Sequence, residues 1–151
     1  MAADHPTKKP PRKPTGVEIE VNDVPLVVWA ARLSLYFLVQ GGIILLAYAY
    51  YGFGIDPDSF ALGFRLDPIH AGVHFVWGLV GSCIGFFRPR YATVYILAFA
   101  AFYTVMAILG TFTPYHLGMK LGTNVNLFHW ALLGPAWAIG LYGLWRDRRS
   151  A

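Results

Sequence analysis

The sequence predicts an all-α fold: a polytopic membrane protein with a four-transmembrane-helix bundle built from two pseudo-repeated helical hairpins. Of the 151 residues, 56% are hydrophobic and only 13% are charged, whereas a soluble domain has about 25% charged residues. Four apolar runs approach or exceed the roughly 18–20 residues that cross a bilayer. These runs cover about 25–51, 68–87, 91–110 and 124–144. The second and fourth runs also share a sequence pattern, which indicates duplicated hairpins.

Residues 1–24 precede the first apolar run and are rich in proline and basic residues. This composition is typical of a disordered tail with a short juxtamembrane linker. The first helix is predicted over 25–51, with Pro25 at its start. Trp29 and Arg32 fit the cytoplasmic interface, and the tyrosines near residue 50 fit the opposite interface.

The second helix, 68–87, has a strong start signal, because Asp67 can cap it and Pro68 takes the first helical position. A short basic turn, Arg88-Pro89-Arg90, leads into the third helix, 91–110. The fourth helix begins near Asn124 and ends at about residue 144. Residues 146–151 are predicted to form a basic C-terminal segment, so that the transmembrane domain covers 25–145.

The basic residues lie at both termini and in the 88–90 turn. The positive-inside rule therefore places both termini and the 88–90 turn on the cytoplasmic side of the membrane, in a multi-pass protein. The basic ends need no nucleic acid as partner, because anionic lipid headgroups suffice.

The duplicated pattern starts from two histidines, His74 and His129. An aromatic residue follows each histidine, a small residue comes seven positions later, and Ile-Gly comes at positions ten and eleven. The matching sets are Phe75, Gly81 and Ile84-Gly85, and Trp130, Ala136 and Ile139-Gly140. A weaker match relates Tyr36 to Tyr95 in the other two helices. Gly81 and Gly85 form a GxxxG pair, which indicates close helix packing either within the bundle or between copies.

Four histidines are predicted to lie near the extracytoplasmic side. His70 and His74 share one helix face, His129 lies at a comparable depth, and His116 is in the adjoining loop. These four residues are the candidate metal ligands, for an ion such as Zn²⁺ or Cu²⁺. His74 and His129 are also the candidate ligands of a haem, or the docking site of a pigment or quinone. The favoured interpretation is nevertheless that no cofactor binds and the histidines hydrogen-bond neighbouring helices.

Gln40 is a further polar intramembrane residue, for which a structural hydrogen bond competes with a substrate contact. The sequence has no nucleophile–base pairing and no nucleotide-binding fingerprint, so no catalytic residues are predicted. The leading hypothesis is a non-catalytic accessory or scaffold subunit of a larger membrane complex. Its partners would be membrane lipids and other membrane subunits, or a second copy of itself. The alternatives are a His-ligated metal, haem or pigment protein serving electron transfer, and a small channel or transporter.

The segments 67–81 (DPIHAGVHFVWGLVG) and 124–140 (NVNLFHWALLGPAWAIG) resemble a bacterial family of small four-helix integral membrane proteins of unknown function. The resemblance covers roughly residues 30–145. It implies a bundle of duplicated hairpins and maps the recurring histidines of the family onto His74 and His129. It implies a location in the bacterial inner membrane, but no activity.

Overall fold

The computed structural model describes residues 25–52, 66–113 and 115–150, so the predicted tail over 1–24 lies outside the described residues. Within these residues the fold has five α-helices, a short 3₁₀ turn and a two-stranded hairpin. In chain order they are α1 (Pro25–Leu33), α2 (Leu35–Tyr51), α3 (Pro68–Phe87), the turn Pro89–Tyr91, α4 (Ala92–Phe112), β1 (Tyr115–His116), β2 (Met119–Lys120) and α5 (Thr123–Ser150).

The predicted four-helix fold is confirmed. In the described part of the chain, four helical spans are long and apolar enough to cross a bilayer, which supports a membrane location. The first of them, Pro25–Tyr51, contains both α1 and α2, because the α-helix is interrupted only at Ser34. The Ser34 N–H donates to the carbonyl of Ala31 at 3.2 Å, and helical backbone angles continue through the break.

The helix ends agree with the sequence signals except at the C-terminus. Asp67 caps α3 by accepting a hydrogen bond from the His70 N–H at 2.9 Å, and Pro68 is the first helical residue. The predicted end of the fourth helix at about residue 144 is too early, because α5 continues to Ser150 and includes the basic residues that follow. The Arg149 guanidinium lies 4.0 Å from the Trp145 ring centre one turn earlier, a cation–π contact that favours the extended helix.

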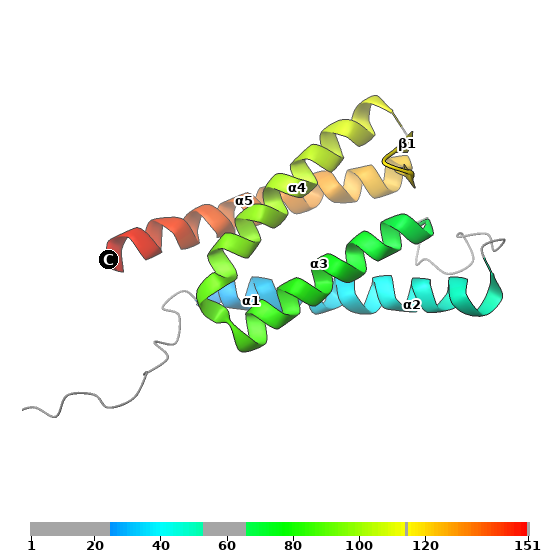
Figure 1. The fold of residues 1–151 in the computed structure, drawn as a ribbon. Helices are drawn as coiled ribbons and strands as arrows, with labels where there is room; N and C mark the ends of the chain where they lie inside the picture. The colour runs from blue at the N-terminus through cyan, green and yellow to red at the C-terminus, as the bar shows by residue number, and fades with distance from the viewer. Residues whose placement is uncertain (1–24, 53–65, 114, 151) are drawn as a thin grey trace, which may run out of the picture.

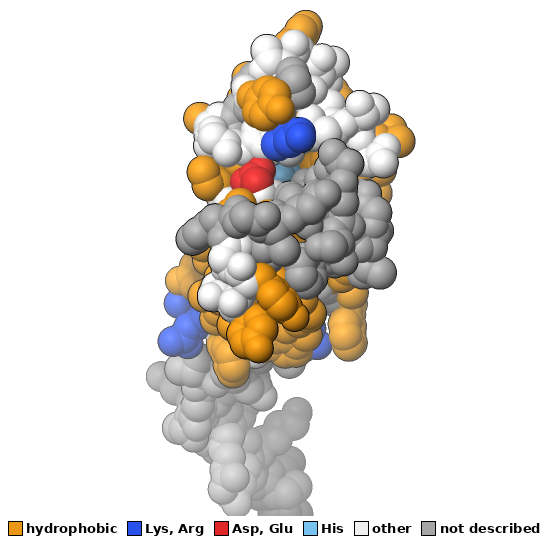
Figure 2. Space-filling model, turned by 90° about the vertical axis from the view of Figure 1, so that its right-hand side faces the viewer, with side chains coloured by type: hydrophobic (Ala, Val, Ile, Leu, Met, Phe, Trp, Pro, Cys, Tyr) orange, Lys and Arg blue, Asp and Glu red, His pale blue; other side chains and the backbone are white. Residues whose placement is uncertain are grey.

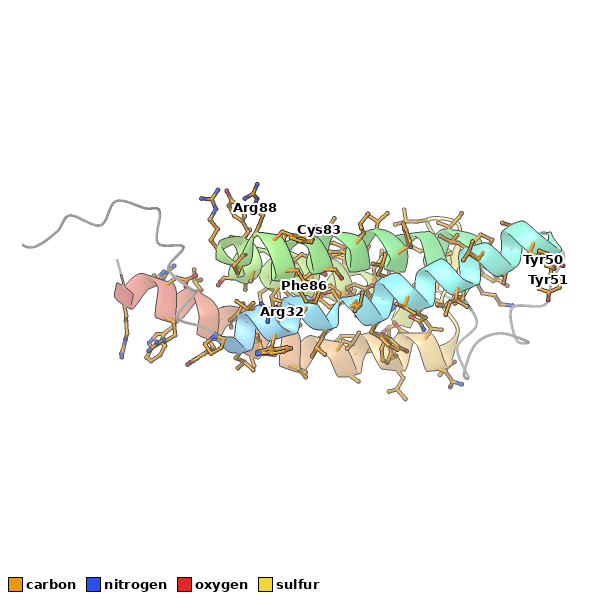
Figure 3. The ribbon with its side chains drawn as sticks, turned by 90° about the horizontal axis from the view of Figure 1, so that it is seen from below. Arg32, Tyr50, Tyr51, Cys83, Phe86 and Arg88 are labelled. Carbon is orange, nitrogen blue, oxygen red and sulfur yellow. The ribbon has the colours of Figure 1, made fainter. Side chains whose placement is uncertain are left out.

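The helices form two antiparallel pairs (Figure 1). The first hairpin consists of α1, α2 and α3, and the second consists of α4 and α5. The start of α1, the α3–α4 turn and the end of α5 lie at one end of the bundle, and the β1–β2 hairpin lies at the other. Figure 3 shows Arg32 and Arg88 toward the first end, and Tyr50 and Tyr51 at the opposite end.

Glycines bring the helices of the first hairpin into backbone contact. An added Cβ at Gly41 would lie 2.6 Å from the backbone nitrogen of Phe75, and one at Gly85 would lie 2.7 Å from that of Arg32. Gly78 faces the backbone of Leu38 still more closely. The GxxxG pair therefore packs within the bundle, because Gly81 and Gly85 both face helices of the same chain.

The second hairpin is joined by side chains. The Thr104 hydroxyl accepts a hydrogen bond from the Trp137 indole at 3.0 Å, and the Thr111 hydroxyl accepts one from Trp130 at 3.1 Å. The side-chain amide of Asn126 also lies 3.2 Å from the Thr111 hydroxyl. Because these threonines are seven residues apart, as are the tryptophans, the contacts recur after two helical turns.

Candidate metal centre

Three histidines converge inside the bundle: His70 and His74 from α3, and His129 from α5. One nitrogen atom of each residue lies within 4.8 Å of the corresponding atoms of the other two. The side chains are 2%, 2% and 1% exposed. The site is therefore an enclosed cluster of three imidazoles contributed by both hairpins.

Local structure explains how the cluster is placed. His70 and His74 are four residues apart in a helix whose start is fixed by the Asp67 cap, so both rings lie on one helix face. His129 lies six residues beyond the start of α5 at Thr123. The β1–β2 hairpin comes directly before that start, at the same end of the bundle as the start of α3. Helix starts at one end therefore set the depth of all three rings.

The rings lie at different distances from one another. The ring centres of His70 and His74 are 4.7 Å apart and their planes are nearly perpendicular, at 86°. The His70 ring centre is 5.5 Å from that of His129, and the His74 and His129 centres are 6.4 Å apart. His70 therefore lies close to both His74 and His129, the two histidines of the sequence repeat.

Only one hydrogen bond between side chains reaches the cluster from the described residues. The Nδ1 atom of His74 lies 2.9 Å from the Oε1 atom of Gln40 on α2. Four other buried nitrogen atoms have no hydrogen-bond partner among the described residues: His70 Nδ1, His74 Nε2, and both nitrogens of His129. A buried polar atom without a partner costs about 1–3 kcal/mol. Such a concentration of unpartnered nitrogen atoms therefore calls for an explanation.

Aromatic rings form the wall on the inner side. The Phe37 ring packs edge-on against His74 with centres 5.0 Å apart, and the Tyr103 ring packs against His129 at 5.1 Å. Tyr103 is 1% exposed, and its hydroxyl also has no partner in the described part of the chain. The histidines are thus held by packing from α2 and α4, the helices that do not carry them.

A small cap covers the end of the bundle next to the cluster. Leu66, Met119 and Leu121 are buried there against Ala71 and Val125. The Asp67 carboxylate joins the cap to α3, because its second oxygen accepts a hydrogen bond from the Lys120 N–H at 2.7 Å. Figure 2 shows the molecule from this end, where acidic and basic side chains lie beside a small exposed area of histidine. Both Asp67 oxygens therefore already accept backbone hydrogen bonds.

The structure brings together His70, His74 and His129 from the predicted set of four candidate ligands. His116 belongs to β1, but its side chain lies outside the described part of the structure. Gln40, for which the sequence left a structural hydrogen bond and a substrate contact open, lies within hydrogen-bond distance of His74. Phe37 and Tyr103 were missed, because one aromatic residue among many carries no signal that it lies beside a histidine.

No known protein family, curated protein or solved structure matches this chain. The resemblance to the bacterial four-helix family stays a prediction. The histidine cluster is therefore the feature of this chain that bears on its function.

Proposed function

We propose that this chain is an integral membrane protein that binds a transition-metal ion through His70, His74 and His129. One observation carries the proposal: three buried imidazoles converge, and each has an unpartnered nitrogen. Imidazole is a preferred ligand of Zn²⁺, Cu²⁺ and Ni²⁺. A bound ion would engage one nitrogen of each histidine, and so up to three of the four nitrogens that otherwise lie buried without described partners.

The spacing suits an ion after a small adjustment. Zn–N bonds of about 2.0–2.1 Å place two tetrahedral ligands roughly 3.3 Å apart. The three nitrogens, which lie within 4.8 Å of one another, would need to close by about 1.5 Å at most. Small rotations of the three side chains supply that movement. Three protein ligands would leave one tetrahedral position for water or another ligand.

A haem between His74 and His129 is less well supported. A macrocycle needs a slot between its two axial ligands, but the His70 ring lies 4.7 Å from one of them and 5.5 Å from the other. The rings of Phe37 and Tyr103 close the inner side. A single ion fits this packing better than a haem or a pigment.

The distribution of charge supports an orientation in the membrane. Arg32 and Arg88 lie toward the end of the bundle that holds the start of α1 and the end of α5. We infer that this end faces the cytoplasm of a bacterial cell, following the positive-inside rule. The histidine cluster then lies in the extracytoplasmic half of the membrane.

The geometry shifts the preference among the three functions expected from the sequence. The accessory or scaffold subunit was the leading hypothesis, and it stays a prediction that is compatible with a bound metal. The channel or transporter alternative relied partly on Gln40, whose side-chain oxygen is engaged by His74. The His-ligated metal protein is the alternative that explains the unpartnered nitrogens.

Equilibrium dialysis of the full chain in detergent micelles against Zn²⁺, with elemental analysis of the protein, tests the proposal. We expect about one ion per chain in the wild type. His70→Ala, His74→Ala and His129→Ala should each weaken binding by 100-fold or more, since changes in the outer shell alone cost about 10–100-fold. Thr104→Val, a polar change away from the site, is the control. Failure of the wild type to bind Zn²⁺, Cu²⁺ or Ni²⁺, or full binding by all three histidine variants, would overturn the proposal.

A further inference from the structure

Gln40 is the one residue among those described that hydrogen-bonds into the histidine cluster from another helix. We infer that Gln40 is a positioning residue for the metal centre, which fixes the tautomer of His74 so that Nε2 faces the ion. This inference rests on the proposed metal-binding function. It assigns to α2, which carries none of the three ligands, a defined part in the site.

The chemistry of the contact sets the direction of the hydrogen bond. The Gln40 atom that lies 2.9 Å from His74 Nδ1 is the side-chain carbonyl oxygen, which only accepts hydrogen bonds. His74 Nδ1 must therefore carry the hydrogen. A neutral imidazole has one N–H and one lone pair, so the lone pair is on Nε2. That atom is buried and has no partner in the described part of the chain, as expected for a metal ligand.

The local sequence explains how Gln40 reaches His74. The next residue, Gly41, lies against the α3 backbone, and an added Cβ there would come within 2.6 Å of the Phe75 nitrogen. This close approach brings α2 near enough for a glutamine side chain to span the remaining distance. One turn before Gln40, the Phe37 ring meets His74 edge-on at 88°. Two contacts from α2 therefore fix both the position and the tautomer of the His74 ring.

His129 lacks a comparable contact. Both of its nitrogens are buried without partners among the described residues, so no described group selects its tautomer. A hydrogen bond to the second nitrogen of a metal-binding histidine orients the ring and increases its basicity as a ligand. His74 is thus the one ligand of the three whose ring nitrogen is held by a described hydrogen bond, whereas His129 is held by packing alone.

The test compares the full-length wild type with Gln40→Leu, which removes the acceptor, and Gln40→Glu, which keeps it. The control is Ser34→Ala, which removes a hydrogen bond between helices elsewhere on the same membrane span. Nitrogen NMR of the metal-free, ¹⁵N-histidine-labelled protein reports the His74 tautomer. Titration with Co²⁺ reports affinity, and its visible absorption reports the coordination geometry. Circular dichroism confirms that each variant is folded.

We expect the wild type to show the Nδ1–H tautomer at His74 and Gln40→Leu to lose it. Gln40→Leu should bind Co²⁺ about 10–100-fold more weakly, with a changed absorption spectrum, whereas Gln40→Glu and Ser34→Ala should stay near the wild type. The role of Gln40 would be overturned if Gln40→Leu bound Co²⁺ as tightly as the wild type. It would also be overturned if Gln40→Leu and Gln40→Glu lost Co²⁺ affinity equally. Neither result would overturn the proposed metal site. A wild type that shows the expected tautomer but binds none of Co²⁺, Zn²⁺, Cu²⁺ and Ni²⁺ would overturn the proposed function instead.

Discussion

The first hairpin supplies two histidines to the site and the second supplies one, and the two hairpins hold their helices together in different ways. In the first hairpin, Gly41 and Gly78 let the backbones of α2 and α3 touch. In the second, threonine hydroxyls on α4 accept hydrogen bonds from tryptophans on α5. The duplicated pattern therefore preserves the histidine while the packing around it differs. The first hairpin is the less adaptable one, because a backbone cannot move aside as a side chain can.

His74 and His129, the histidines of the sequence repeat, also differ in their contacts. His74 has Gln40 as a hydrogen-bond partner, whereas neither nitrogen of His129 has a partner among the described residues. A histidine that served only to join helices would be expected to make a hydrogen bond. A role in joining helices would therefore explain His74 but not His129. His129 is thus the stronger sign of a binding site.

The largest effect should come from the glycine contacts of the first hairpin. An added Cβ in Gly78→Ala would overlap the Leu38 backbone, with the Cα atom only 2.5 Å away, so α2 and α3 must separate. Overpacking typically costs about 1–3 kcal/mol and occasionally more. We expect a loss of about 3 kcal/mol in the free energy of unfolding, measured by SDS titration in mixed micelles.

Gly140→Ala in the second hairpin is the matched comparison. Its added Cβ would meet the Cδ2 atom of the Leu97 side chain at 2.7 Å, and that side chain can rotate. The expected loss is about 1 kcal/mol, the lower end for an overpacked site. Gly134→Ala, which faces open space, should cost nothing. Equal losses for Gly78→Ala and Gly140→Ala would contradict the contrast between the hairpins.

A second comparison replaces each histidine by leucine in the metal-free protein. His74→Leu leaves the Gln40 oxygen without its partner and should cost about 1–2 kcal/mol of unfolding free energy. His129→Leu removes two buried nitrogens that have no described partner, so it should be neutral or slightly stabilising. SDS unfolding curves for both variants measure the difference. A His129→Leu variant as destabilised as His74→Leu would show that His129 has a structural role.

The sequence predicted the four spans because membrane-crossing length and hydrophobicity are properties of single segments. The Asp67 cap and Pro68 likewise located the start of α3, since capping is local. The convergence of the histidines could not be predicted, because helix rotation depends on which faces pack. Tyr36 and Tyr95 match in the weak part of the repeat, yet Tyr36 is 47% exposed and Tyr95 is 3% exposed. Only the three-dimensional contacts distinguish such positions.

The smallest effects should come from the threonines of the second hairpin. The Thr111 hydroxyl accepts from Trp130 and lies within 3.2 Å of the Asn126 amide, whereas the Thr104 hydroxyl accepts from Trp137. Hydrogen bonds between membrane helices contribute about 0.6 kcal/mol on average, with a maximum near 1.7. We expect Thr111→Val to lower the unfolding free energy by about 1 kcal/mol and Thr104→Val by about half as much.

The threonine variants also distinguish the packing of the second hairpin from its role at the site. Valine has nearly the same shape as threonine, so each variant removes a hydroxyl and leaves the helix–helix distance unchanged. Both variants should therefore keep the Zn²⁺ affinity of the wild type, as measured by the same dialysis. If Thr111→Val weakened Zn²⁺ binding as much as His129→Ala, the threonine–tryptophan contacts would belong to the mechanism that places His129. The contrast between a rigid first hairpin and an adaptable second hairpin would then be wrong.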